Sequence, residues 1–271
     1  MTRSVLEILH PDRVPRGTVR AAVFDFDGTV STLRCGWERV MGPMMLEFLS
    51  PGKTPDAALV EEVRRYIDES TGIQTIYQMQ WLSSRAEELT GVSRDPWFYK
   101  DEYNRRLMLS VDGKKRALEE GSADPGDYLV AGSLSFLDAL KSRGIDLYLA
   151  SGTDHTDVLR EAEVLGAAPY FTEIRGAPAR QASCSKEAVL GALFSEKRFT
   201  GSELLVVGDG KVEIGLGRQC GAYTLGAATD EETRSGVNPV KRARLVKAGA
   251  DALTGDFTNA DSILRWLDGE I

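Results

Sequence analysis

Four short apolar runs, each stopped by small or acidic residues, constrain the fold of this chain more than any other feature. They are RAAVFDF (20–26), IDLYLAS (145–151), ELLVVGD (203–209) and GAYTLGAA (221–228). Runs of this length without polar alternation suit strands that are buried on both faces. Helical patterns alternate with them at 133–144, 156–166, 185–196 and 258–270. The alternation predicts an α/β fold with a doubly wound, mostly parallel sheet.

The segment between the first two runs has a different pattern. From about Thr32 to Ala123, apolar residues recur at helical spacing, and no convincing strand lies between them. Turn-forming sequences bound this segment, GTVST on entry and GSADPGD on exit. We therefore predict an α/β core made of residues 1–31 and 124–271, interrupted by a helical domain at 32–123.

Composition excludes several classes of partner. The 271 residues carry a formal net charge of -8 and contain no Lys/Arg-rich block, so we expect neither nucleic acid nor a membrane as partner. No stretch approaches the ~20 apolar residues of a membrane span, and we expect a cytoplasmic protein. Three scattered cysteines, Cys35, Cys184 and Cys220, and only two histidines predict neither a disulfide framework nor a zinc site.

The residues that end the apolar runs predict where the site lies. The first run ends in Asp25 and Asp27, the second in Ser151 and Gly152, and the third in Asp209. In parallel α/β sheets, ligands bind beyond the carboxyl ends of the strands. We therefore expect these side chains to meet at one edge of the sheet.

Asp25 and Asp27 are two like charges separated by one residue. Close carboxylates repel each other unless a cation lies between them. Mg²⁺ prefers a few carboxylate oxygens and keeps its other positions for water and phosphate oxygens. A single aspartate at a strand end is typical of a turn or a helix cap. The joint placement of Asp25, Asp27 and Asp209 instead favours a magnesium site.

Four sequences, FDFDGT, LASGT, SKEAVL and VVGDGKVEIG, resemble in order and spacing the four motifs of the haloacid dehalogenase-like phosphohydrolase superfamily. They span residues 20–215 and are specific as a set, although GDG or SGT alone has little weight. The resemblance implies a phosphatase that acts on phosphate monoesters, with Mg²⁺ as cofactor. It also implies that the inserted helical domain is the cap that closes over the site and selects the leaving group.

By this resemblance, two aspartates divide the chemistry. Asp25 would be the nucleophile that attacks phosphorus and forms an aspartyl phosphate. Asp27 would protonate the departing alkoxide as a general acid and then activate water as a base. The dehalogenase branch lacks the second aspartate because halide leaves unaided, so Asp27 favours phosphate over halide.

Three further residues would hold the phosphoryl group. The hydroxyl of Ser151 and the backbone N–H of Gly152 would bind a phosphoryl oxygen where the chain enters a helix. Lys186 would offset the charge between the Asp25 carboxylate and the phosphoryl group. The lysine motif is the least specific of the four, and Lys197 is an alternative.

The resemblance also implies a metal site. Asp25, Asp209 and the backbone carbonyl of Asp27 would bind Mg²⁺. Glu213, one helical turn beyond Asp209, would hold a coordinated water or orient Lys186.

The substrate is predicted only as a small phosphorylated metabolite, such as a sugar or polyol phosphate. The helical segment offers side chains that could face the site, but packing or solvation is the stronger explanation for each, so none is assigned. They are Arg34, Trp37, Glu38, Gln74, Tyr77, Gln78 and Trp81. Asp154 follows Ser151 and is expected to cap a helix.

Several alternatives remain open. A phosphomutase of this fold would carry a histidine-bearing loop after the first motif, and VSTLRCGWERV has none. A phosphonate-cleaving relative would need a lysine from the cap, for which Lys53 is the only early candidate. A catalytically silent phosphate-binding protein would keep the fold without turnover. A dinucleotide-binding loop at GDGKVE is disfavoured because Glu213 replaces the third glycine.

Overall fold

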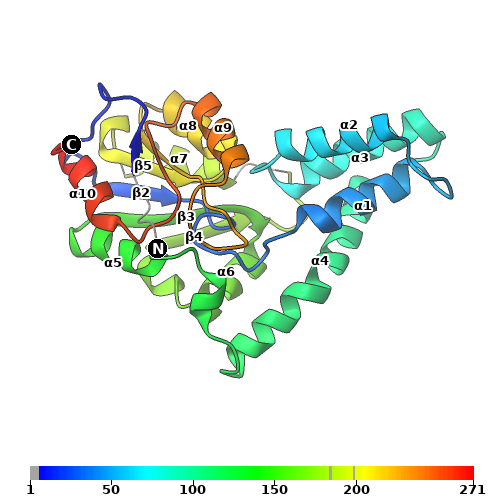
Figure 1. Ribbon diagram of the computed structural model, residues 1–271, viewed down its shortest axis with the longest axis horizontal. Helices are drawn as coiled ribbons and strands as arrows, with labels where there is room; N and C mark the ends of the chain where they lie inside the picture. Colours follow the sequence, from blue (N-terminus) through cyan, green and yellow to red (C-terminus); the bar gives the residue numbers. More distant parts are fainter. Residues whose placement is uncertain (1–5, 183–184, 198) are drawn as a thin grey trace.

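The structure is a computed structural model that describes residues 6–182, 185–197 and 199–271. The first five residues of the predicted core domain and Cys184 lie outside these ranges, as does the side chain of Ser185. Within them the core is a seven-stranded sheet in the order β1-β7-β6-β5-β2-β3-β4 (Figure 1). The strands are β1 (Glu7–Ile8), β2 (Ala21–Phe24), β3 (Asp146–Asp154), β4 (Glu173–Ala177), β5 (Leu204–Gly208), β6 (Tyr223–Ala227) and β7 (Ala252–Thr254).

Strand β2 is the topological switch of the sheet. It pairs in parallel with β3 on one side and with β5 on the other, so that Phe24 lies beside Leu149 and Val207. Only β1, at the edge, is antiparallel to its neighbour β7. The predicted mostly parallel, doubly wound sheet is therefore confirmed. The carboxyl ends of β2, β3 and β5 lie side by side, which is where a ligand binds in such a fold.

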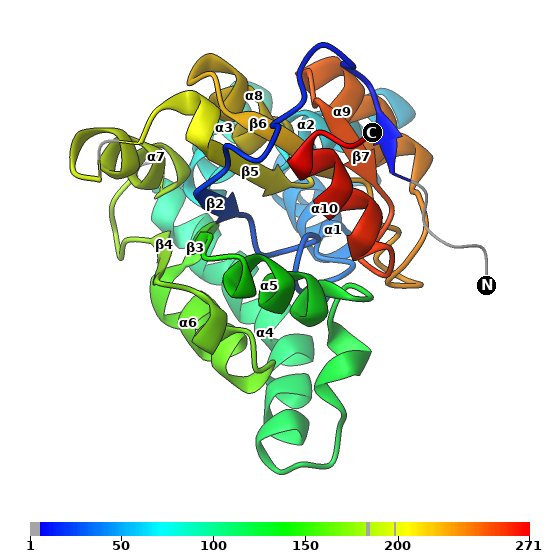
Figure 2. The same ribbon diagram turned by 90° about the vertical axis from the view of Figure 1, so that its left-hand side faces the viewer.

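Helices cover both faces of the sheet, which explains why the central strands have no polar alternation (Figure 2). On one face, Ala22 and Phe24 pack in a cluster with residues of α5, α6 and α10. On the other face, Ala21 and Val23 pack with residues of α7. The core helices are α5 (Ser133–Ser142), α6 (His155–Val164), α7 (Ser185–Ser195), α8 (Lys211–Gln219), α9 (Pro239–Ala248) and α10 (Ala260–Asp268).

Four helices between β2 and β3 extend beyond the carboxyl ends of the strands (Figure 1). They are α1 (Glu38–Leu49), α2 (Ala57–Glu69), α3 (Thr75–Thr90) and α4 (Pro96–Glu119). Asp56 and Asp95 cap α2 and α4 by accepting hydrogen bonds from backbone N–H groups of their first turns. All four helices fall within the predicted insertion at 32–123. The exact division into two domains remains a prediction.

Several short elements were not predicted from the sequence. Strands β1, β4 and β7 are absent from the prediction, and so are helices α1 and α9. The remaining elements are single 3₁₀ turns, η1 (Pro125–Tyr128), η2 (Ala168–Tyr170) and η3 (Gly201–Glu203). Among the described residues, no helix combines the length and apolar character needed to cross a bilayer.

Candidate active site

The nucleophile candidate lies at the carboxyl end of the central strand. Asp25 follows β2 directly and is only 6% exposed. Its Oδ1 lies 3.0 Å from Nζ of Lys186, which belongs to α7. Burial, together with the carboxylates of Glu213, Asp209 and Asp27, raises the pKa of Asp25 well above its ordinary value, although Lys186 opposes the shift. Negative charge is therefore concentrated here beyond what one lysine offsets.

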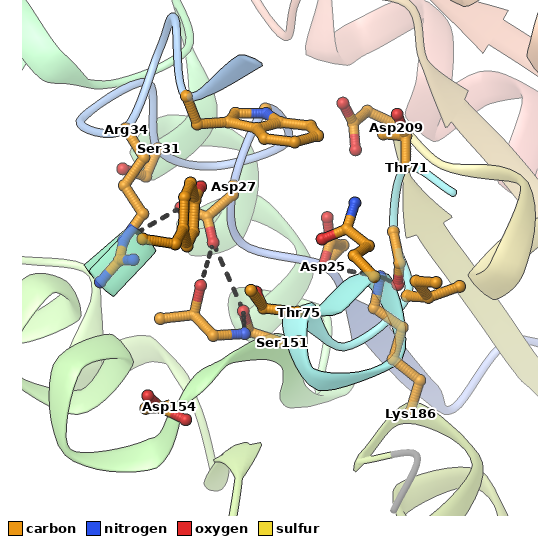
Figure 3. A pocket seen from close by; sticks show the side chains of 18 of the residues that line it. Asp25, Asp27, Ser31, Arg34, Thr71, Thr75, Ser151, Asp154, Lys186 and Asp209 are labelled. Carbon is orange, nitrogen blue, oxygen red and sulfur yellow. Dashed lines mark hydrogen bonds and ion pairs between the residues drawn. The ribbon is translucent and has the colours of Figure 1, made fainter. Parts of the chain in front are cut away.

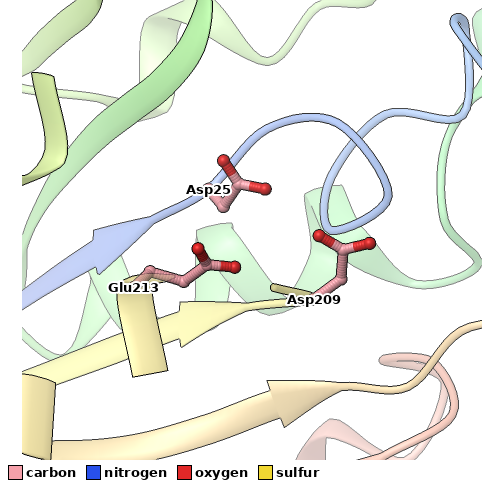
Figure 4. Close-up of side chains that lie close together, drawn as sticks. All are labelled: Asp25, Asp209 and Glu213. Carbon is pink, nitrogen blue, oxygen red and sulfur yellow. The ribbon is translucent and has the colours of Figure 1, made fainter. Parts of the chain in front are cut away.

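Three carboxylates converge at this strand end (Figure 4). Asp25, Asp209 and Glu213 are buried, and one carboxylate oxygen from each lies within 4.8 Å of the others. Hard oxygen donors at this density are the ligand chemistry of Mg²⁺. A divalent cation would also relieve the carboxylate repulsion that adds to the effect of burial on the pKa of Asp25. The residues present therefore fit the predicted metal, and Glu213 lies in the cluster beside the two predicted carboxylate ligands.

The second aspartate of the first motif points away from this cluster (Figure 3). Oδ2 of Asp27 accepts a 2.8 Å hydrogen bond from the Thr153 hydroxyl and a 3.5 Å bond from the Ser151 hydroxyl. Oδ1 is buried without a hydrogen-bond partner among the described residues, and Nε of Arg34 lies 3.9 Å away. The backbone turn after β2 thus separates the two carboxylates into different environments. Thr153 was not predicted, because nothing in its sequence context distinguishes it from an ordinary turn residue.

Arg34 is held by a second carboxylate network. Its guanidinium donates to both carboxylate oxygens of Glu161, which is fully buried on α6, and to Asp157. Burial disfavours the charged form of Arg34, yet Glu161 and Asp27 raise its pKa above the ordinary value. Arg34 therefore links the turn after β2 to helix α6.

The predicted phosphate-binding residues lie at the end of β3. Ser151 is 1% exposed, and its Oγ accepts a 3.0 Å hydrogen bond from the backbone N–H of Thr153. A Cβ at Gly152 would lie 3.2 Å from the carbonyl oxygen of Ile73, which belongs to the helical insertion. A larger residue at this position would crowd the backbone of the insertion, which would have to shift by a few tenths of an ångström.

Lys186 is the lysine that reaches the site. It is 3% exposed and bridges Oδ1 of Asp25 at 3.0 Å and Oε2 of Glu213 at 2.7 Å. Burial alone would lower the pKa of Lys186, but Asp25 and Glu213 raise it above the ordinary value, so the ammonium stays charged. The alternative, Lys197, is exposed near the end of α7.

Asp209 has a cationic partner that its sequence motif does not indicate. Nζ of Lys241, on α9, lies 2.7 Å from Oδ2 of Asp209 and 2.6 Å from Oε1 of Glu231. Burial would raise the pKa of Asp209, but Lys241 and Arg244 lower it below the ordinary value. Lys241 follows Asp209 by 32 positions in an ordinary amphipathic helix, so no local pattern marks it.

The loop between α2 and α3 lies directly over the cluster. The carbonyl oxygen of Gly72 accepts a 3.4 Å hydrogen bond from Lys186 Nζ, and a Cβ at Gly72 would lie 3.3 Å from Oε2 of Glu213. Core and insertion together form a partly open cavity of about 100 Å³, and the predicted residues Asp25, Asp27 and Ser151 are among those that line it.

Some candidates from the insertion line this cavity and others do not. Arg34, Trp37 and Gln78 line it. Trp81 instead stacks on Tyr66, with ring centroids 3.9 Å apart and planes 11° apart, so its role is packing. The other candidates, Glu38, Gln74 and Tyr77, do not line it.

Asp154 departs from its predicted role as a capping residue. It occupies the N-cap position of α6 but makes no side-chain capping hydrogen bond. Its carboxylate instead accepts hydrogen bonds from Lys100 and Asn104 of α4. Charge attraction from the facing helix thus outweighs local capping, and all three residues line the cavity.

The dinucleotide alternative is incompatible with the geometry at the start of α8. The Glu213 carboxylate accepts a hydrogen bond from the backbone N–H of Gly210, which places an anion where a pyrophosphate would bind.

A family model described as haloacid dehalogenase-like hydrolase matches residues 19–221. No curated protein sequence matches the chain at a significant level.

Solved structures show the same fold at low identity. A predicted phosphoglycolate phosphatase from Haemophilus somnus is 16% identical, with a TM-score of 0.62, over 91% of this chain and 98% of that one. A β-phosphoglucomutase from Clostridium difficile is 14% identical, with a TM-score of 0.63, over 92% and 97%. A CbbY variant from Rhodobacter sphaeroides in complex with xylulose-1,5-bisphosphate is 16% identical, with a TM-score of 0.59, over 89% and 96%. The family match spans most of the chain, including Asp25, Asp27, Lys186 and Asp209, and the protein therefore belongs to the haloacid dehalogenase-like hydrolases.

Proposed function

We propose that the protein is a Mg²⁺-dependent phosphatase that hydrolyses a small phosphorylated metabolite through an aspartyl phosphate on Asp25. The observation that carries this proposal is that the two aspartates lie in different environments. Asp25 contacts Lys186 and the carboxylate cluster, whereas Asp27 points to the opposite side of the cavity. A nucleophile and a separate acid are what phosphoryl transfer from an alcohol requires.

In the first step, a carboxylate oxygen of Asp25 attacks phosphorus while the bond from phosphorus to the ester oxygen breaks. Asp27 donates a proton to that oxygen, so the leaving group departs as a neutral alcohol. Lys186 offsets the repulsion between the Asp25 carboxylate and the phosphoryl oxygens. Ser151 and the backbone N–H of Gly152 hold one phosphoryl oxygen.

In the second step, Asp27 takes a proton from water, and the water oxygen attacks phosphorus. The bond from phosphorus to Asp25 breaks, which regenerates the carboxylate and releases inorganic phosphate. The insertion excludes bulk water during the first step and must admit one water for the second.

In this scheme Asp25, Asp209 and the backbone carbonyl of Asp27 would hold Mg²⁺, which offsets charge on the phosphoryl oxygens when bound. Glu213 would orient Lys186, to which it is bonded at 2.7 Å, and support the metal site from the start of α8.

The rival functions have less support. Among the described residues that line the cavity, none is a histidine, so the phosphomutase alternative gains nothing from this site. Lys53 is exposed and does not line the cavity, which argues against phosphonate chemistry.

Phosphate release from a panel of phosphate monoesters, with and without Mg²⁺, tests the proposal. We expect Asp25→Asn to reduce release by at least about a thousandfold, because the nucleophile is lost while the shape of the side chain is kept. Asp138→Asn, which removes an exposed carboxylate from α5, is the matched control and should retain activity.

Circular dichroism would establish that both variants fold. Undiminished phosphate release by a folded Asp25→Ala variant would contradict the proposed mechanism. An isomerised phosphate ester without release would support the phosphomutase, and binding without either would support a silent phosphate-binding protein.

A further inference from the structure

We infer that the leaving group of the substrate carries no negative charge of its own, so that the substrate class is the monophosphate ester of a small neutral polyol. This inference rests on the phosphatase function proposed above and narrows its substrate. Its basis is the pairing of every cation that lines the described part of the cavity.

The position of Asp27 tells where the leaving group lies. Its carboxylate faces the Thr153 hydroxyl, on the side of the cavity away from Lys186 and Asp209 (Figure 3). An acid that protonates the ester oxygen must contact it, so the alcohol extends from Asp27 toward the insertion. The insertion contributes Trp37, Tyr103, Asn104 and Lys100 to the cavity lining, and Asn104 and Lys100 contact Asp154, the residue after Thr153.

Lys100 is the cation of the lining that could bind a negatively charged leaving group. Its charge is already neutralised. It is 7% exposed and forms an ion pair with Asp154, whose other carboxylate oxygen accepts a 3.1 Å hydrogen bond from Asn104. A buried lysine on this side would be expected to attract a carboxylate or a second phosphate. The paired Asp154 cancels that attraction and would repel a second anion.

The other two cations that line the cavity are also paired with carboxylates. Arg34 is bonded to Glu161 and Asp157. Lys186 is bonded to Asp25 and Glu213, and its remaining role is toward the transferring phosphoryl group.

The charge of the whole lining supports the same conclusion. Five acidic side chains line the cavity, from Asp25, Asp27, Asp154, Asp209 and Glu231, against three cations, and Lys241, just outside the lining, is itself paired with Asp209 and Glu231. Each of these cations already has a carboxylate partner, so the surroundings of the alcohol hold no positive charge in excess. A carboxylate there would be desolvated without a partner, which is costly.

The side chains on this side of the cavity can both donate and accept hydrogen bonds. The Asn104 amide, the Tyr103 phenol and the Lys100–Asp154 pair offer donors and acceptors to hydroxyl groups, and Trp37 adds an apolar wall. A neutral polyol satisfies this polarity.

A matched substrate pair tests this inference directly. Glycerol 3-phosphate and 3-phosphoglycerate differ only where a CH₂OH group replaces a carboxylate. We expect kcat/KM to favour glycerol 3-phosphate by on the order of tenfold or more, the effect of one uncompensated charge at this range.

Two variants should change the ratio of kcat/KM for the two esters in opposite directions. Asp154→Asn leaves Lys100 without its counter-charge and should shift the ratio toward 3-phosphoglycerate by on the order of tenfold. Lys100→Met leaves Asp154 uncompensated and should shift it the opposite way. The double variant restores neutrality and should return the ratio toward that of the wild-type protein.

Asp101→Asn is the matched control. Asp101 follows Lys100 on α4. Its exposed side chain forms an ion pair with the exposed Arg180, and neither residue lines the cavity. Removing its charge should leave the substrate ratio unchanged.

p-Nitrophenyl phosphate separates failure of this inference from failure of the proposed function. If the wild-type protein with Mg²⁺ hydrolyses no monoester, including p-nitrophenyl phosphate, the proposed function itself fails. If p-nitrophenyl phosphate is hydrolysed but 3-phosphoglycerate equals or exceeds glycerol 3-phosphate, the inference is overturned. If neither ester of the pair turns over, the ratio of their inhibition constants against p-nitrophenyl phosphate hydrolysis replaces the ratio of kcat/KM, and tighter binding of 3-phosphoglycerate overturns the inference. A ratio that Asp154→Asn leaves unchanged would also overturn it.

Discussion

At the scale of single residues, the site is governed by which carboxylates receive a cation and which do not. Glu231 has to share its cation, because Lys241, which contacts it at 2.6 Å, also contacts Asp209 at 2.7 Å. Burial and the negative charges of Asp209 and Glu38 raise the pKa of Glu231 to about 7, against an ordinary value of 4.5. Between pH 4.5 and 7, the folded protein therefore holds a proton on Glu231 that the unfolded chain releases.

This difference predicts a pH dependence of stability. Between pH 4.5 and 7 the folded state binds more protons than the unfolded state, so the free energy of unfolding decreases as the pH rises through this range. Relative to Glu231→Gln, which does not titrate, we expect the wild-type protein to lose about 2–3 kcal/mol between pH 5 and pH 8. Urea unfolding in EDTA at several pH values measures this. Parallel profiles for the two proteins would contradict the assignment.

At the scale of elements, the loop between α2 and α3 connects the insertion to the catalytic cluster. Gly72 has φ of +89°, and its carbonyl accepts a hydrogen bond from Lys186. A side chain at this position would meet the carboxylate of Glu213. The loop therefore combines a left-handed backbone that favours glycine with a close approach to Glu213 that a Cβ would crowd.

Gly72→Ala and Gly52→Ala separate these two requirements. Both glycines have positive φ, so both variants should lose about 1–2 kcal/mol of stability. A Cβ at Gly52 meets nothing within 4 Å, whereas a Cβ at Gly72 lies 3.3 Å from Oε2 of Glu213. We expect only Gly72→Ala to lower kcat/KM for phosphate release, by about tenfold, because the loop must move away from Lys186. Equal losses of activity in both variants would show that backbone strain alone is responsible.

At the scale of the whole molecule, the apolar core runs without interruption from the sheet into the insertion. One buried cluster contains Phe24 and Phe136 of the α/β core together with Met44, Val63 and Tyr99 of the insertion. Shared burial couples the stability of the two parts, because neither can lose its structure without exposing apolar surface of the other.

We therefore expect a single unfolding transition, with calorimetric and van't Hoff enthalpies that agree. Met44→Ala removes a fully buried side chain of α1 and should lower the stability of that one transition by about 2–5 kcal/mol. Leu109→Ala, on α4 and 76% exposed, is the control and should change it little. Two resolved transitions, with only one of them shifted by Met44→Ala, would contradict the coupling.

The elements that the sequence predicted are those whose signals are local. Strands β2, β3, β5 and β6 are apolar runs, and α5, α6, α7 and α10 have helical periodicity, so each is specified by its own residues. Strand β4 contains Arg175 and lies at the sheet edge, and β7 has only three residues, so neither has a distinctive pattern. Helix α1 carries Pro43 in its interior, which weakened the helical signal.

The sequence by itself determined the fold class, because apolar runs and helical periodicity are local signals, and its resemblance to a known family supplied the candidate residues Asp25, Asp27, Ser151, Gly152, Lys186, Asp209 and Glu213. Only the tertiary structure decided the partners of those residues. The pairing of Asp154 with Lys100 joins positions 54 apart, and that of Lys241 with Asp209 joins positions 32 apart. Such contacts depend on how helices pack over a sheet, and electrostatic attraction between distant segments leaves no periodic signal in either one.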